Sequence, residues 1–152
     1  MLEFENTIRI DRPVDEVFGL LSDFENIPKW NYYVLEASQR TDSPIGVGTT
    51  YHQVRKTDEQ DFRITESEPN HTVAMKTLPQ SSPSLEMRFT LYEEGNTTLI
   101  RDEWKLDTGR PAIFERLAGG RVKSAVAENL AKLKELLEEG RVVLQDGSQV
   151  TV

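Results

Sequence analysis

The chain has 152 residues, no cysteine, and 18 basic against 26 acidic side chains, for a formal net charge of −8. This length fits one domain with one hydrophobic core. The negative charge argues against a nucleic-acid partner and against docking on anionic membranes through charge. The lack of cysteine excludes disulfides, thiolate metal sites and cysteine nucleophiles. We see no signal peptide and no transmembrane segment in the sequence, so we expect a cytoplasmic protein.

The first 31 residues predict a strand followed by two short helices. Residues 3–11 alternate apolar and polar side chains, as a half-buried strand does. Pro13 and the apolar residues spaced after it predict a helix that continues to Leu21. Residues 23–31 predict a second short helix that closes on Trp30. Two roles are open for Trp30, because a large indole either fills the core or faces a ligand.

A run of strands and one long helix follow. The strands are expected at residues 34–41, 49–56, 62–67, 72–78, 85–92 and 97–106, with "TDEQ" (57–60) among the turns between them. From Pro111 to Glu139, apolar residues recur at helical spacing and predict a helix of about 28 residues. Gly119 and Gly120 interrupt this pattern. They indicate a kink, a close approach to the sheet, room for a ligand, or a break between two helices.

This order of elements indicates an α+β fold with an antiparallel sheet covered on one face by the long helix. Three stretches resemble the START-like (SRPBCC) superfamily and, within it, the polyketide cyclase/dehydrase group: "IRIDRPVDEVFGLLSDFENIPKWN" (8–31), "GVGTTY" (46–51) and "IFERLAGGRVKSAVAENLAKLKELLEE" (113–139). The resemblance implies a helix-grip fold, in which a curved seven-stranded antiparallel sheet wraps around the C-terminal helix and leaves a cavity between them. It implies one START-like ligand-binding domain over residues 1–139. Residues 140–152 are then a C-terminal tail or hairpin, and Asp146-Gly147 is a hairpin signal within it.

Asp102 breaks the pattern of its strand. Alternation places it on the inward face with Ile100, Trp104 and Leu106, where an unpaired carboxylate is costly. Such a group indicates a polar anchor or a general acid/base with a raised pKa. An ion pair near the end of the sheet, or an error of one residue in the assigned register, would also account for it.

A second candidate group comes from the strand after "GVG". Tyr51, Gln53 and Arg55 share one face and would place hydrogen-bonding groups in an apolar pocket, while His52 points to solvent. Arg55 either neutralises Asp102 or lies solvated at the strand end. No spacing of ligands predicts a metal site, and we expect no cofactor. The other residues expected to contact a ligand are Trp30, Phe62, Met75, Met87, Phe89, Trp104, Phe114 and Leu117.

Three functions follow as hypotheses. The first is binding of a hydrophobic small molecule, such as a lipid, an isoprenoid or a polyketide-like compound, in the cavity that the resemblance implies. The second is a cyclase or dehydratase acting on a polyketide-like substrate, with Asp102 as acid/base and Tyr51, Gln53 and Arg55 as polarising donors. The third is a protein-interaction module that pairs by strand addition at the tail. A homodimer is compatible with each of the three.

Overall fold

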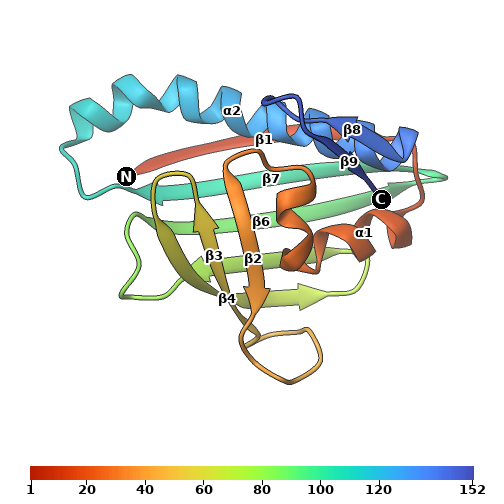
Figure 1. Ribbon diagram of the computed structural model, residues 1–152, viewed down its shortest axis with the longest axis horizontal. Coiled ribbons are helices and arrows are strands. Elements are labelled where there is room, and N and C mark those ends of the chain that lie inside the picture. Colours follow the sequence, from red (N-terminus) through yellow and green to blue (C-terminus); the bar gives the residue numbers. More distant parts are fainter.

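The computed structural model describes all residues from 1 to 152 (Figure 1). Its main sheet contains seven strands, with a long helix, two short helices and a small C-terminal hairpin around it. The strands of the main sheet are β1 (Leu2–Ile10), β2 (Val34–Gln39), β3 (Thr50–Arg55), β4 (Glu59–Glu68), β5 (Thr72–Thr77), β6 (Ser84–Glu94) and β7 (Thr97–Asp107). The helices are α1 (Val14–Leu21), the 3-10 helix η1 (Phe24–Lys29) and α2 (Ala112–Glu139).

The sheet has the strand order β1-β7-β6-β5-β4-β3-β2, and every neighbouring pair is antiparallel. The first strand therefore pairs with the last one, and β1 and β2 form the two edges. Figure 1 shows α2 lying along the sheet beside β1. The 3-10 helix η1 packs against β2, and α1 packs against β6 and β7. This arrangement confirms the predicted α+β helix-grip fold.

The alternation read from the sequence gives the two faces of the sheet. In register, Phe4 lies opposite Trp104, Trp104 opposite Met87, and Met87 opposite Met75. Because side chains alternate along a strand, this row shares one face, which is the face toward α2. The hydrophobic core gathers on this inner face and includes Leu130 and Leu133 of α2.

The turn between β3 and β4 is shorter in the structure than the sequence predicts. Glu59 and Gln60, which we expected in the turn 57–60, are the first residues of β4 and pair with Val54 and Gln53 of β3. The start of β4 could not be predicted from apolar alternation, because its first residues are polar and are held in the strand by pairing with β3.

The two adjacent glycines do not divide α2, which excludes a break between two helices, one of the alternatives that the sequence left open. The helix runs from Ala112 to Glu139 without interruption. A Cβ atom added at Gly119 would lie 2.9 Å from Leu2 Cδ1, whereas one added at Gly120 would meet nothing within 4 Å. Gly119 thus allows a close approach between α2 and β1, which is one of the roles that the sequence indicates.

The last residues form a two-stranded sheet of β8 (Arg141–Val143) and β9 (Gln149–Thr151). The turn between them contains Gly147 with a φ of +86°, a conformation that favours glycine. Val142 and Leu144 are buried against the main core. In Figure 1 this hairpin lies against the C-terminal half of α2. None of the helices has both the length and the apolar character that a membrane crossing requires.

Candidate ligand-binding cavity

A cavity of about 420 Å³ lies between the inner face of the sheet, η1 and α2. Most of the residues that line it are hydrophobic. The sheet contributes side chains from β3 to β7, among them Met75, Leu85 and Met87, and α2 contributes Val122, Ala125 and Val126. The wall is therefore apolar, with a small number of polar groups at defined places.

Asp102 lies on this wall. Its residue is 1% exposed, and the carboxylate has no cationic partner, so an ion pair does not account for it. The indole Nε1 of Trp104, two residues along the same face, donates to both carboxylate oxygens at 3.0 and 3.1 Å. Burial raises the pKa of Asp102 to about 8, although the hydrogen bond from Trp104 opposes this rise. At neutral pH the group is therefore mainly a carboxylic acid, which can donate a hydrogen bond as well as accept one.

Trp30 packs in the core and also lines the cavity, so its contact with a ligand stays a prediction. Its ring packs edge-on against Phe89, with 6.3 Å between ring centroids, and it also lines the cavity. Its Nε1 is buried and has no hydrogen-bond partner. A buried donor without a partner is costly, which makes this group a candidate contact for a ligand oxygen.

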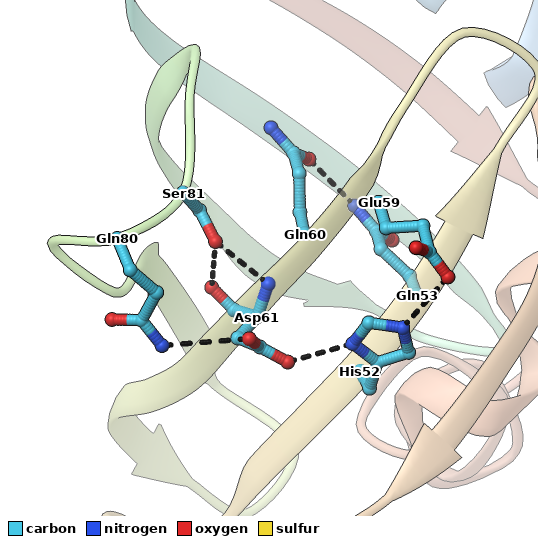
Figure 2. A network of polar contacts seen from close by, with 7 residues as sticks. All are labelled: His52, Gln53, Glu59, Gln60, Asp61, Gln80 and Ser81. Atoms are coloured by element: carbon cyan, nitrogen blue, oxygen red, sulfur yellow. Dashed lines mark hydrogen bonds and ion pairs between the residues drawn. The ribbon is translucent and has the colours of Figure 1, made fainter.

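A glutamine pair forms the polar part of the wall on β3 and β4 (Figure 2). The side-chain amide of Gln53 donates to Gln60 Oε1 at 2.9 Å, and the amide of Gln60 donates to the carbonyl of Pro83 at 3.0 Å. Both glutamines are buried. These two bonds fix the orientation of both side-chain amides.

Arg55 does not neutralise Asp102. It reaches the cavity wall, but its guanidinium donates two hydrogen bonds to Asp58, at 2.7 and 2.8 Å, across the turn between β3 and β4. This pairing lowers the pKa of Asp58. The other guanidinium on the wall belongs to Arg121 of α2, which is exposed and forms no ion pair.

The predicted ligand-contacting residues divide into three groups in the structure. Those on the cavity wall are Trp30, Gln53, Arg55, Met75, Met87, Asp102 and Trp104. Tyr51, Phe62 and Phe89 point inward but fill the core; Tyr51 stacks on Phe62 at 5.3 Å, and burial raises the Tyr51 pKa to about 12. Phe114 and Leu117 of α2 lie outside the cavity, 56% and 75% exposed. The contact of any of these residues with a ligand stays a prediction.

Sequence reasoning did not single out most of the wall that α2 forms, including Asn129, or Gln60 on β4. Asn129 is buried and occupies a position on the packed side of α2 with Val126 and Leu133. A polar residue at such a position is an observable signal in the sequence. Gln60 gave no comparable signal, because its inward direction depends on the register between β3 and β4.

His52 belongs to a separate cluster on the outer face of the sheet (Figure 2). Its two ring nitrogens contact Asp61 at 2.7 Å and Glu59 at 3.3 Å, and these contacts, the one with Asp61 first, raise the histidine pKa. The Ser81 hydroxyl bonds to the backbone of Asp61 and not to the histidine. The cluster therefore connects β3, β4 and the following loop, and it contains no activated nucleophile.

A depression of about 530 Å³ also exists, lined mainly by outward-pointing side chains of the sheet. Charged residues dominate it, and some of them pair, as Lys76 does with Glu86 at 3.1 Å. Its surface is thus polar and already neutralised in part. The smaller cavity on the inner face is the better candidate for a hydrophobic ligand.

A family model described as polyketide cyclase / dehydrase and lipid transport matches residues 1–138. The chain belongs to this family. The match covers all of the main sheet and nearly all of α2, so the predicted membership of the polyketide cyclase/dehydrase group is confirmed. Among curated proteins, none matches the chain in sequence.

Solved structures share the fold of this polyketide cyclase / dehydrase family member. The di-domain ARO/CYC BexL from the BE-7585A biosynthetic pathway aligns with a TM-score of 0.69 and 16% identity, over 91% of this chain but 48% of its own. Protein MLL2253 from Mesorhizobium loti aligns with a TM-score of 0.70 and 22% identity, over 90% and 97% of the two chains. A START superfamily protein from Mycobacterium smegmatis aligns with a TM-score of 0.67 and 16% identity, over 90% of this chain and 99% of its own. The chain thus spans about half of the BexL protein, and these similarities support the fold alone.

Proposed function

We propose that the protein binds a hydrophobic small molecule, of a lipid, isoprenoid or polyketide-like class, in the cavity between the sheet and α2. The observation that carries this proposal is an apolar cavity whose wall holds two buried polar groups with unused hydrogen-bonding capacity. Trp30 Nε1 has no partner, and Asp102 has only the indole of Trp104. Membership of a family described as including lipid transport agrees with it.

The cavity volume agrees with a small-molecule ligand. Its value of about 420 Å³ lies within the roughly 300–1,000 Å³ that is usual for such sites. The apolar wall would bury the hydrocarbon part of the ligand, at about 25 cal/mol per Å² of apolar surface removed from water. A carbonyl or hydroxyl oxygen on the ligand would accept from Trp30 and contact the Asp102 acid. We therefore expect a largely apolar molecule that carries at least one neutral oxygen function.

Intrinsic fluorescence offers a direct test, because both tryptophans of the chain, Trp30 and Trp104, line the cavity. Titration with long-chain alcohols, isoprenoid quinones and aromatic polyketides should change their emission in a saturable way. Ala125→Phe should fill the cavity from α2 and weaken this binding at least about tenfold, since overpacking excludes the ligand. Ala127→Phe, two residues along on the exposed side, is the matched control. Equal affinities for the two variants would rule out binding at this place.

A second candidate function is an acid/base enzyme of the cyclase or dehydratase type, with Asp102 as the proton donor. The raised pKa favours it, because a neutral acid near pH 7 can protonate a leaving hydroxyl or a carbonyl oxygen. Asp102→Asn separates the two candidates. A binding protein should retain ligand affinity within a few-fold, whereas an enzyme should lose turnover while still binding its substrate.

A further inference from the structure

The N-terminal half of α2, with the turn that leads into it, exposes apolar and basic side chains together. We call this surface the α2 docking face. It consists of Ile113, Phe114, Leu117, Arg116, Arg121 and Lys123 of α2, together with Arg110, which lies two residues before the helix. In Figure 1, no other element lies over the outer side of this half of the helix, whereas the C-terminal half lies beside the β8–β9 hairpin. The face is thus free in the folded chain.

The apolar part of the face is large for an unpartnered surface. Ile113, Phe114 and Leu117 are 65%, 56% and 75% exposed. Ile113 and Leu117 are four positions apart and Phe114 is three from Leu117, so the three side chains are neighbours on the helix surface. Three adjacent large apolar side chains that stay in water indicate an interaction site more than scattered exposure does.

The charge of the same segment is opposite to that of the chain. Residues 110–123 contain four cations and one carboxylate, in a chain with 18 cations and 26 carboxylates. That carboxylate, Glu115, is buried and accepts a hydrogen bond from the N-terminal ammonium of Met1 at 2.8 Å. None of the four cations forms an ion pair, whereas Arg88 and Arg101 on the outer face of the sheet do.

We propose that the α2 docking face binds an anionic lipid bilayer at its surface. The apolar side chains would enter the boundary between headgroups and acyl chains, and the flanking cations would contact lipid phosphates. A helix with an apolar stripe between basic residues fits a bilayer interface, which offers both kinds of partner over a wide area. Because the local charge is positive, the negative net charge of the chain does not prevent this contact.

The position of the face connects it with the cavity. Arg121 is part of the face and also lines the cavity, as does Val122 beside it. A bilayer bound here would lie next to the place where α2 borders the cavity. A hydrophobic ligand would then have a short path between the bilayer and the cavity. The proposal goes beyond the proposed function, since vesicle binding does not require an occupied cavity and is measured without a ligand.

Co-sedimentation of the full chain with vesicles tests the proposal. One set of vesicles is phosphatidylcholine alone, and in the other about a third of the lipid is phosphatidylglycerol. We expect binding to the anionic vesicles, weaker binding to the neutral ones, and a marked loss when salt rises from about 0.1 M to 1 M. The paired variant Arg116→Glu with Lys123→Glu should weaken binding at least about tenfold.

Two single variants separate the apolar contribution from nonspecific adhesion. Ile113→Asp removes an apolar side chain but places a carboxylate in the first turn of α2, where the helix dipole favours it, so the fold should persist. It should weaken vesicle binding several-fold. Val47→Asp removes a side chain of similar exposure, 69%, from the loop between β2 and β3 and should have no effect.

Three results would overturn the proposal: no binding to either kind of vesicle, equal binding of the charge-reversed variant, or an equal loss with Val47→Asp. The first of these would leave the face to an acidic protein partner. Ligand titration by tryptophan fluorescence without vesicles should be the same for Ile113→Asp and the unaltered chain. A failure of vesicle binding is therefore distinguishable from a failure of the cavity to bind a ligand.

Discussion

Asp102 is the residue whose environment says most about the function of the protein. A carboxylate at an apolar inner position is costly, and its one hydrogen-bond donor, Trp104, does not offset the loss of water. The side chain therefore stabilises the fold best as the neutral acid. A buried acid whose ionised form destabilises the fold is more readily explained by contact with a ligand than by packing.

Asp102→Asn keeps the shape of the side chain and removes its ionisation. Because the folded-state pKa is raised from 3.8 to about 8, the favourable contribution of the acid is complete below about pH 4 and is lost as the pH rises through about 8. The free energy of unfolding of the variant relative to that of the unaltered chain should therefore rise by about 1.4 kcal/mol per pH unit between about pH 5 and pH 8, and then level off. Urea unfolding at three pH values across this range measures the difference.

Asp42→Asn, in the exposed loop after β2, controls for the removal of one negative charge. Its unfolding free energy should follow that of the unaltered chain at each pH. Parallel curves for Asp102→Asn and the unaltered chain would mean that Asp102 does not titrate as a buried acid. His52 does not interfere, because it is present in all three proteins.

At the scale of elements, α2 is a single helix with two unequal glycines. Gly119 faces β1, where its missing Cβ leaves room for Leu2, and Gly120 faces open space. A glycine inside a helix costs about 1 kcal/mol relative to alanine. Only the first of the two therefore has a packing reason.

Gly120→Ala should raise the free energy of unfolding by about 1 kcal/mol, since the new Cβ meets nothing and helix propensity improves. Gly119→Ala should gain less, because Leu2 Cδ1 at 2.9 Å must move aside. Thermal or urea unfolding of the two variants measures this order. A loss of stability with Gly120→Ala would contradict this account, because it would mean that the continuous helix α2 needs the glycine at this position.

For the whole molecule, local patterns predicted the order of elements and the inner face of the sheet. Alternation in the last strand placed Asp102 and Trp104 correctly, because a period of two needs no knowledge of distant contacts. The extent of α2 was also predictable from helical spacing. The cavity itself was expected only from the family resemblance, since no local pattern encodes empty space.

Contacts set by register and by helix phase were not predictable. Arg55 pairs with Asp58 across the turn between β3 and β4, whose length was not predicted correctly from the sequence. Leu117 lies nine residues before Val126, which is about two and a half turns of helix, so the two point to opposite sides. The sequence prediction treated all apolar residues of α2 as one face. It therefore placed Leu117 at the cavity and did not predict the exposed apolar surface.

The measurement that tests the central claim most directly is organic extraction of the natively purified protein, followed by mass spectrometry of the extract. The account predicts a hydrophobic compound with a carbonyl or hydroxyl oxygen, in near-stoichiometric amount, in the extract of the unaltered chain. The same compound should be present with Ala127→Phe and strongly depleted with Ala125→Phe. An extract without such a compound, or one equally rich from the cavity-filled variant, would contradict binding in the cavity between the sheet and α2.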